Sequence, residues 1–337
     1  MTKNLPYYKV SGNYEKVGEF LGNTFRDKIT QRIKERRRSI PNYESYLTKS
    51  QKCLDITRYF FPHLMKETTE IAKAAGIPLV EYFFMNNREV FDEAEAHDKK
   101  HSANIDHCTV VAGFDKGKLV IGHNEDWSIS ALSEICILEI EIENIAFIGL
   151  NYMSVIPGSA ASLNNAGLVQ CINDIYQTAQ IGVPKNYVAR AILETKSLDE
   201  AERLIRNTNK ASGFNHVLAC GNEIRNIEIA GDKLGIQNII NEPYVHTNHY
   251  LTNELKPLEK FHTKSSDARY ERAYSLLTTN MTDEDIKRIL SDTNDNEYPI
   301  CRENETIGSA IFIPSELQAS FCYGHPCKGT YISYNLY

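Results

Sequence analysis

Four short stretches of the 337-residue chain carry side chains that could act together in nucleophilic catalysis. The first begins at Cys108, which opens a run of apolar and β-branched residues; the second contains Asp126, the third Asn248 and the fourth Arg269. A thiol attacks a carbonyl as its thiolate, and an unperturbed cysteine with a pKa near ~8.5 is mostly protonated at neutral pH. Catalysis at Cys108 would therefore require a base nearby, and without one this residue is an ordinary buried cysteine of a strand.

Residue types as well as spacing connect these stretches to a known family. Cys-Thr at 108–109 is followed at hairpin distance by Gly-His-Asn-Glu-Asp-Trp at 122–127. Tyr-Val-His-Thr-Asn-His-Tyr occupies 244–250, and Ser-Asp-Ala-Arg-Tyr occupies 266–270. Together they resemble the isopenicillin N acyltransferase (acyl-coenzyme A:6-aminopenicillanic acid acyltransferase) family. This is a branch of the cysteine N-terminal-nucleophile (Ntn) hydrolases, related to the choloylglycine (bile salt) and penicillin V amidases.

The resemblance implies a self-processing enzyme. In Ntn hydrolases the chain is cut before the nucleophile, and the freed α-amino group, with a pKa of roughly 7.7 to 8.0, serves as the base. Here Cys108 would attack the carbonyl of His107, and water would hydrolyse the thioester to leave chains of 107 and 230 residues (337 − 107). Many relatives carry a glycine before the nucleophile, which eases backbone strain. His107 stands in that place here, and its imidazole could assist proton transfer.

The same resemblance suggests roles for other side chains. Asp126 is similar to the aspartate that hydrogen-bonds and orients the free amino group. Asn248 matches the asparagine that stabilises the oxyanion, a contribution of typically ~2.7 to 4 kcal/mol, and Asn164 resembles another active-site asparagine of the bile salt hydrolase branch. Arg269 is similar to the arginine near the nucleophile, where a guanidinium would lower the thiol pKa and could anchor a substrate carboxylate. Arg272, one turn later, is the alternative.

Each of these residues also has a purely structural interpretation. Asp126 could cap the hairpin, and Asn-Asn-Ala-Gly at 164–167 could be only a turn, with either Asn164 or Asn165 as the residue that aligns. Arg269 could lie on a helix surface.

The main hypothesis is an autoproteolytic cysteine Ntn hydrolase or acyltransferase that cleaves or transfers the acyl group of a small-molecule linear amide through a thioester on Cys108. No metal or organic cofactor is required, although acyl-coenzyme A could be the acyl donor. One alternative is an amidase that uses an unprocessed, internal Cys108 with His107 or His249 as base. Another is a catalytically silent Ntn-fold binding protein. The joint presence of four matching residues favours the first hypothesis, because a binding module has no need of all four.

Composition excludes several other classes. The chain is 42% hydrophobic, enough for a sizeable core in one or two domains. The net charge is −7. The one dense basic stretch, Lys34–Arg38, contains an acid and continues a helical pattern, so we expect a solvated helix face and no nucleic-acid partner. We find no apolar signal core and no run of about 18 apolar residues, and therefore expect a cytoplasmic protein with no membrane partner.

Cysteine and histidine spacing gives no sign of a disulfide scaffold or a metal site. Eight cysteines are few for a chain of this length, and most are expected to be buried as small hydrophobic residues. His97, His101 and His107 lie in a polar stretch without a ligand pattern, which favours a solvated linker. Cys322 and Cys327 lack a second ligand pair, which favours strand-end packing over zinc.

Hydrophobic periodicity predicts a helical first third of the chain. One helix is expected over Asn13–Arg38, a second over Leu54–Ala75 with Gly76 as its C-cap, and a third from Val80 to about Phe91. Residues 92–107 are polar and predict an exposed linker, the kind of segment that can be cut without dismantling a core.

From Cys108 onward the pattern changes to strands and pairs of helices. Asp115-Lys116-Gly117 predicts a hairpin turn, and Ser197 to Glu200 predicts a capping box. Strands are expected over 110–114, 118–122, 135–142, 145–151, 167–173, 216–221, 224–230, 309–314, 319–323 and 330–334, and helices over 187–195, from 197, over 265–277 and over 282–290.

Paired strands separated by blocks of helices argue for antiparallel sheets covered by helices, an α+β class. The resemblance implies more, the Ntn-hydrolase four-layer αββα sandwich with an N-terminal helical pro-segment. We therefore expect residues 1–107 to be the pro-segment, the smaller chain after self-cleavage, and residues 108–337 to be the Ntn core. The cleaved 1–107 segment would be retained as a non-covalent subunit, and the protein could form a homo-oligomer.

Overall fold

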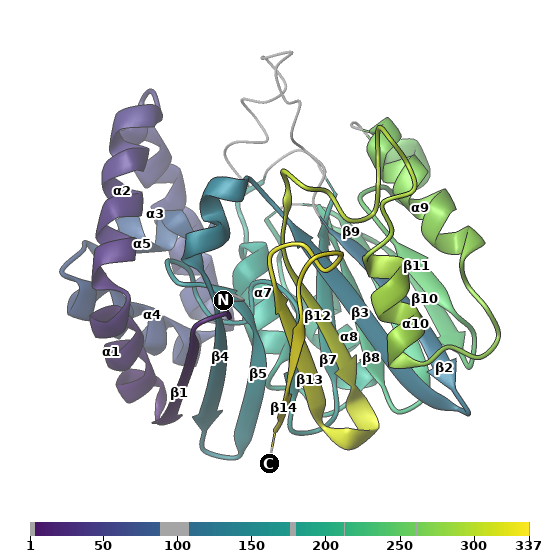
Figure 1. Ribbon diagram of the computed structural model, residues 1–337. Coiled ribbons are helices and arrows are strands. Elements are labelled where there is room, and N and C mark those ends of the chain that lie inside the picture. Colours follow the sequence, from purple (N-terminus) through teal and green to yellow (C-terminus); the bar gives the residue numbers. More distant parts are fainter. Residues whose placement is uncertain (1–3, 88–107, 176–179, 212, 260–261, 337) are drawn as a thin grey trace.

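The computed structural model of the chain describes residues 4–87, 108–175, 180–211, 213–259 and 262–336. Two β-sheets lie at the centre of the molecule, and helices lie on the outer side of each (Figure 1). The predicted α+β class is therefore confirmed. The linker predicted over residues 92–107, including His107, falls outside the described residues.

The larger sheet, sheet A, has eight strands, and the smaller, sheet B, has six. In sheet A the order is β1 (Tyr7–Gly12), β4 (Ile135–Ile142), β5 (Ile145–Tyr152), β6 (Ser162–Asn164), β7 (Val169–Asp174), β8 (Phe214–Cys220), β9 (Glu223–Ala230) and β10 (Lys233–Ile240). In sheet B the order is β11 (Tyr244–His246), β2 (Thr109–Asp115), β3 (Lys118–Asp126), β12 (Thr306–Ile313), β13 (Gln318–Tyr323) and β14 (Tyr331–Asn335). Neighbouring strands are antiparallel except β1 and β4, which are parallel.

The helices belong to two groups. Those before β2 are α1 (Tyr14–Thr24), α2 (Arg26–Ser39), α3 (Tyr43–Phe60), α4 (Pro62–Ala75) and α5 (Leu79–Met85). Those after it are α7 (Lys185–Ile192), α8 (Leu198–Asn207), α9 (Lys264–Ser275) and α10 (Asp283–Leu290).

Alternating side chains on β2 explain why the sheets stack. Val110 and Ala112 join an apolar cluster that also contains Ile148 and Leu150 of sheet A. Val111, between them in the chain, belongs to a different cluster, together with the apolar side chains of α10. Because successive side chains of a strand point to opposite faces, sheet B is buried by sheet A on one face and by helices on the other.

The outer face of sheet A is covered in the same way. Leu138 and Ile140 of β4 pack with Val17 and Leu21 of α1 in a third cluster, and further helices, α7 among them, cover the strands toward β9. The packing therefore runs helices, sheet A, sheet B, helices, which is the predicted αββα order of layers.

Two helices predicted as continuous are each interrupted. The first ends at α1 and restarts as α2 around Phe25, whose φ of −106° and ψ of 15° are not helical. The second is divided between α3 and α4 at Pro62, the first residue of α4. Proline is tolerated there because the N–H groups of the first turn have no helical partner. Gly76, by contrast, is the left-handed C-cap that the sequence predicts, with φ 74°.

The segment before Cys108 was predicted to be helical, and this prediction is incomplete. Its first element is β1, which pairs in parallel with β4 over Tyr7 to Gly12 and forms an edge of sheet A. The following helix, α1, packs closely on α4 through glycines. A Cβ atom at Gly18 would lie 2.4 Å from the carbonyl oxygen of Glu67, so only glycine permits this approach.

A buried ion cluster, here called the Arg190 cluster, connects this segment to the rest of the protein. Arg190 of α7 donates to Glu67 of α4 at 3.0 Å and to Glu194 at 3.0 Å, and its guanidinium lies 4.8 Å from the Phe147 ring centre. Arg190 and Glu67 are both fully buried. The cluster therefore holds residues on both sides of position 108 together.

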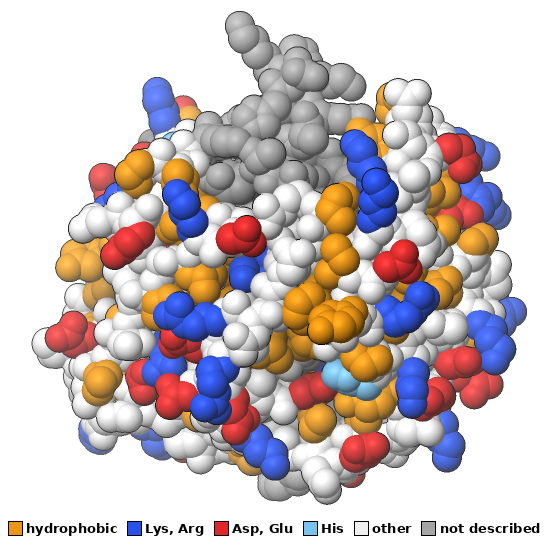
Figure 2. All heavy atoms as spheres, turned by 180° about the vertical axis from the view of Figure 1, so that it is seen from behind, with side chains coloured by type: hydrophobic (Ala, Val, Ile, Leu, Met, Phe, Trp, Pro, Cys, Tyr) orange, Lys and Arg blue, Asp and Glu red, His pale blue; other side chains and the backbone are white. Residues whose placement is uncertain are grey.

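None of the described helices combines the length and hydrophobicity needed to span a bilayer. On the face seen in Figure 2, basic and acidic side chains are interspersed rather than gathered into a patch of one sign.

Candidate active site

Cys108 lies directly before β2, at the end of sheet B. Thr109 pairs with Asn124 of β3, so Cys108 comes opposite Glu125. The Cys108 side chain is only 5% exposed, and its backbone has φ 87°, a conformation that non-glycine residues rarely adopt. Such a conformation costs on the order of 1–3 kcal/mol and clusters at functional sites.

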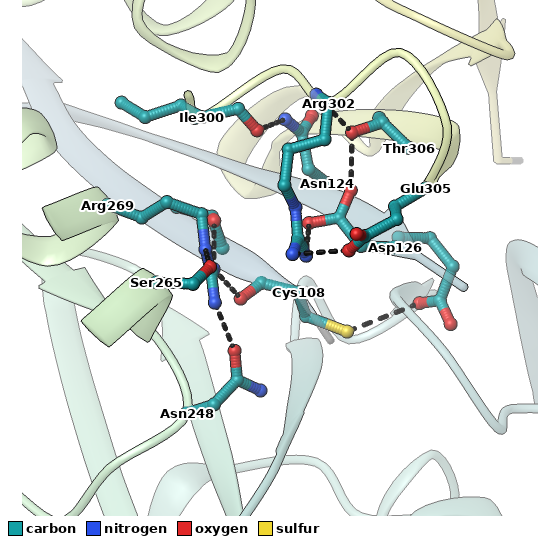
Figure 3. Close-up of polar contacts among 12 residues, drawn as sticks. Cys108, Asn124, Asp126, Asn248, Ser265, Arg269, Ile300, Arg302, Glu305 and Thr306 are labelled. Atoms are coloured by element: carbon teal, nitrogen blue, oxygen red, sulfur yellow. Dashed lines mark hydrogen bonds and ion pairs between the residues drawn. The ribbon is translucent and has the colours of Figure 1, made fainter. Parts of the chain in front are cut away.

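Arg269 joins three of the stretches singled out by the sequence (Figure 3). Its Nη1 donates to the carbonyl oxygen of Cys108 at 2.8 Å and to Oγ1 of Thr109 at 2.7 Å, and its Nη2 donates to Oδ1 of Asn248 at 2.8 Å. Arg269 is fully buried, and Ser265, one turn earlier on α9, accepts from its Nε at 3.3 Å. The structure thus brings Cys108, Asn248 and Arg269 together.

Asn248 follows β11 of sheet B, and its side chain reaches the end of β7 in sheet A. Its main-chain N–H donates to Oγ of Ser266 at 2.8 Å, and its side-chain Nδ2 donates to the carbonyl oxygen of Asp174 at 3.0 Å. Asp174 ends β7 and its carboxylate forms an ion pair with Lys185. The amide of Asn248 is therefore held on both sides.

Asp126 forms the other side of the site. Arg302 donates to its Oδ2 at 2.9 Å and Thr306 to its Oδ1 at 2.5 Å, and Figure 3 shows both contacts. Burial opposes ionisation, but Arg302, Arg269 and the Thr306 hydroxyl outweigh it and lower the pKa of Asp126. Asp126 is therefore a carboxylate near the start of β2, as its predicted role requires.

The Cys108 thiol has a negatively charged environment. Its Sγ lies 3.8 Å from Oε2 of Glu125. Burial raises the thiol pKa well above its ordinary value, and the charges of Glu125, Asp174 and Asp126 raise it further, whereas the Asp126 main-chain N–H lowers it. The expected lowering of the thiol pKa is therefore not found, and Arg269 bonds the carbonyl oxygen of Cys108.

Asn164 is the one predicted residue that the described contacts do not join to this group. Its Nδ2 donates to the carbonyl oxygens of Leu193 and Thr195, and its Oδ1 accepts from the N–H groups of Ala166 and Leu168. These bonds hold the turn after β6 against the end of α7, which is the structural interpretation of this residue.

The alternative residues lie in other environments. Arg272 forms a two-bond ion pair with Asp292 at 3.1 and 2.7 Å. Nδ1 of His249 bonds Oγ of Ser266 at 2.8 Å, and burial, followed by the charges of His246 and His262, lowers the His249 pKa to about 4. No hydrogen bond in the described part of the chain connects His249 to Cys108.

A model of the family described as acyl-coenzyme A:6-aminopenicillanic acid acyl-transferase matches residues 114–328 of this chain. The chain belongs to this family. The predicted resemblance is thereby confirmed, and members of this acyl-transferase family are amidohydrolases and acyltransferases acting on amides, as predicted.

Two further similarities accompany the acyl-transferase family match. The chain is 21% identical to the beta-alanyl-dopamine/carcinine hydrolase of Drosophila melanogaster over 343 residues, which cover 91% of this chain and 88% of that protein. It also resembles a mutant of the conjugated bile acid hydrolase from Clostridium perfringens, with a TM-score of 0.49 and 11% identity over 68% of this chain and 92% of that one.

Several side chains at this candidate site were not identified from the sequence. Tyr152 donates to Oε1 of Glu125 at 2.6 Å, and Nε2 of His123 lies 2.9 Å from Oε2 of Glu125. His123 and Glu125 are two positions apart on β3, so their side chains lie on the same face of the strand. This spacing could have placed both on the Cys108 side. Arg302 lies outside the helices and strands, and no local pattern identifies it.

Two groups of side chains in the described part of the chain could hold a metal ion. Cys108, His123 and Glu125 place one ligand atom each within 4.8 Å of one another, and so do His249, His262 and Asp267. In the first group the imidazole and the carboxylate are already bonded to each other.

Proposed function

We propose that Cys108 is the nucleophile of a self-processed enzyme that cleaves or transfers the acyl group of a linear amide. The observation that carries the proposal is the buried hydrogen-bond set in which Arg269 connects the carbonyl of Cys108 to Asn248. A substrate carbonyl held at the sulfur would lie beside an amide donor of the kind that stabilises a tetrahedral oxyanion.

Processing would be the first use of the thiol. The Cys108 sulfur attacks the carbonyl carbon of His107, the C–N bond breaks, and the nitrogen of Cys108 leaves as an amine that takes up a proton. Water then hydrolyses the thioester, which restores the thiol and leaves a carboxylate on His107. The positive φ of Cys108 supports this step, because strain at the bond to be cut is released by cutting it.

The raised pKa of the Cys108 thiol supports an enzyme whose base arises only by processing. In the uncut chain the thiol is protonated, and the carboxylates of Glu125, Asp174 and Asp126 surround it. Cleavage places an amine on the same residue, and proton transfer from sulfur to this amine gives a thiolate beside an ammonium group. The ammonium charge would then offset the neighbouring carboxylates.

In turnover, the thiolate would attack the substrate carbonyl, and the ammonium would give its proton to the leaving amine. The acyl group then remains on sulfur as a thioester, and water or an amine attacks it while the α-amine of Cys108 takes the proton. Asp126, paired with Arg302 and Thr306, would orient that amine.

The segment before Cys108 would stay bound after the cut. The pairing of β1 with β4, the packing of α1 on sheet A and the Arg190 cluster all join residues that lie on opposite sides of the cleavage site. We therefore propose a mature protein of two non-covalent chains, which could associate further as a homo-oligomer.

The fly relative is named for hydrolysis of β-alanyl amides, which supports water as the acceptor and places β-alanyl amides in the first substrate panel. Acyl-coenzyme A is the donor to test for transfer. All eight cysteines are free thiols, which supports a cytoplasmic location.

The deciding experiment is the intact mass and N-terminal sequence of freshly purified wild type and Cys108→Ala. We expect wild type to contain chains of 107 and 230 residues, the larger beginning Cys-Thr-Val-Val, which co-elute in gel filtration. Cys108→Ala should remain one chain. Incubation with an amide substrate followed by hydroxylamine should trap the acyl group only from wild type.

Other outcomes would identify the alternatives. A single active chain would contradict self-processing and point to an internal cysteine with a different base. A single chain without activity, whose Cys108→Ala variant binds the same amides as wild type, would identify a silent binding protein.

A further inference from the structure

The three carboxylates around the Cys108 thiol differ in their partners. Asp126 is paired with Arg302, and Asp174 is paired with Lys185. The Cys108 thiol donates to Oε2 of Glu125 at 3.8 Å, yet among the described residues no lysine or arginine pairs with Glu125. This leaves a buried carboxyl group, 7% exposed, without a lysine or arginine partner beside the sulfur of Cys108.

Glu125 also contacts a tyrosine and a histidine. Tyr152 donates to Oε1 at 2.6 Å, and its own pKa is raised well above the ordinary value by burial and by Glu125. His123 contacts Oε2 through Nε2, while its Nδ1 is buried with no hydrogen-bond partner in the described part of the chain.

These two contacts come from different sheets, because Tyr152 ends β5 of sheet A and His123 lies on β3 of sheet B. Oε1 thus accepts from Tyr152, and Oε2 contacts both His123 and the Cys108 thiol, whereas a carboxylate can accept about four hydrogen bonds. Glu125 is fixed in position and retains acceptor capacity beside the sulfur.

We propose that Glu125 binds a positively charged amino group in the acyl part of the substrate, so that this enzyme prefers amides of small amino-acyl groups. The proposal rests on Cys108 being the nucleophile. It assigns Glu125 as a specificity-determining residue, because it recognises a part of the substrate that does not react.

Distances limit the position of that amino group. A carbonyl carbon about to be attacked lies about 3–3.5 Å from the sulfur, and each further bond adds about 1.5 Å. Since Oε2 of Glu125 is 3.8 Å from the sulfur, an amine one or two carbons from the carbonyl can reach it. In a longer acyl chain, the amino group would lie beyond the Glu125 carboxylate.

Binding of such a cation would also favour the reaction. The charge of Glu125 disfavours the thiolate, and an ammonium group placed on Glu125 would cancel that effect. The thiol would then ionise more readily when the correct substrate is present than when the site is empty.

The test compares two amides that differ only in this charge, β-alanyl-p-nitroanilide and butyryl-p-nitroanilide, on processed wild type, Glu125→Gln and Glu141→Gln. The last is the control, because Glu141 is exposed on β4. We expect wild type and Glu141→Gln to prefer the β-alanyl substrate by about 10- to 100-fold in kcat/KM, the range for a hydrogen bond to a charged group. Glu125→Gln should reduce the preference to about 3-fold or less while it still cleaves the butyryl amide.

Two results would overturn the proposal. An equal loss on both substrates with a shifted pH profile would make Glu125 the partner of the Cys108 α-amine or a general base. An unchanged preference in Glu125→Gln would remove it from substrate recognition.

A second measurement does not depend on amidase activity. Cationic 2-aminoethyl methanethiosulfonate and neutral propyl methanethiosulfonate each form a mixed disulfide with Cys108 and release methanesulfinate, and peptide mass spectrometry gives the rate at Cys108 and at the exposed Cys327. We expect the cationic reagent to be favoured at Cys108 in wild type but not in Glu125→Gln, with no such change at Cys327. If wild type cleaves neither amide but keeps this preference, the proposed function fails and the cation site stands; if the preference is absent, the cation site fails.

Discussion

Two buried arginines in this protein differ in their partners: Arg190 meets carboxylates, and Arg269 meets uncharged oxygens. In the Arg190 cluster, a fully buried guanidinium meets Glu67 and Glu194 directly and lies over an aromatic ring. At the active site, Arg269 is equally buried, but the hydrogen bonds described above go to uncharged oxygens, while Glu125 stands beside the thiol without a lysine or arginine among the described residues. The first arrangement pairs its side chains within the fold, whereas in the second the proposed partner of Glu125 is the substrate.

Removing one partner from the Arg190 cluster should have the largest effect on stability. Arg190→Met leaves Glu67 buried without its cation, and breaking a buried pair in this way typically costs ~3–5 kcal/mol. Urea denaturation should show this loss, while kcat per folded molecule stays near wild type. The double variant Arg190→Met/Glu67→Met should recover part of it. A cost below about 1 kcal/mol would mean that the cluster does not hold the two segments together.

Removing Arg269 should instead act on catalysis. Arg269→Met releases the carbonyl of Cys108 and the side chain of Asn248, and we expect kcat/KM to fall by about 10²–10³-fold, the usual effect of losing an oxyanion donor. Arg272→Met is the matched control, since this arginine lies on the same helix but pairs with Asp292. Circular dichroism establishes that both variants are folded. Equal activity in the two variants would contradict the assignment.

The smallest expected effect is the pH dependence contributed by Asp126. Its pKa is lowered in the fold, so its stabilising contribution is complete above the unfolded value of about 3.9 and is lost as the pH falls through the folded pKa. Below pH 4 the difference in unfolding free energy between wild type and Asp126→Asn should therefore shrink. A difference that stays constant down to pH 2 would show that Asp126 is not ionised in the folded protein.

Local sequence patterns predicted the parts of the fold that local forces determine. The hairpin of β2 and β3 follows from apolar residues on both sides of Asp115-Lys116-Gly117, and at the capping box predicted from Ser197 to Glu200 the Ser197 side chain accepts from the Glu200 N–H. β1, β6, β10 and β11 were missed. β1 and β10 lie at sheet edges with half-exposed, partly polar sequences, and β6 and β11 have only three residues each.

The candidate site was predictable to the extent that residue types matched a family. Cys108, Asn248 and Arg269 do come together, and Asp126 lies close to them. Arg302 could not be found, because its contact with Asp126 spans 176 positions. Asn164 matched by type, but its hydrogen bonds are with main-chain groups of its own turn and of the end of α7.

The position of β1 has a consequence for how this protein can be made. Residues 108–337 produced alone would expose the edge of β4 and the apolar face carrying Leu138 and Ile140, and such a surface promotes aggregation. Folding must therefore precede any cut before Cys108. Separate expression of the two pieces should give inclusion bodies from the larger one, whereas co-expression should give a soluble complex.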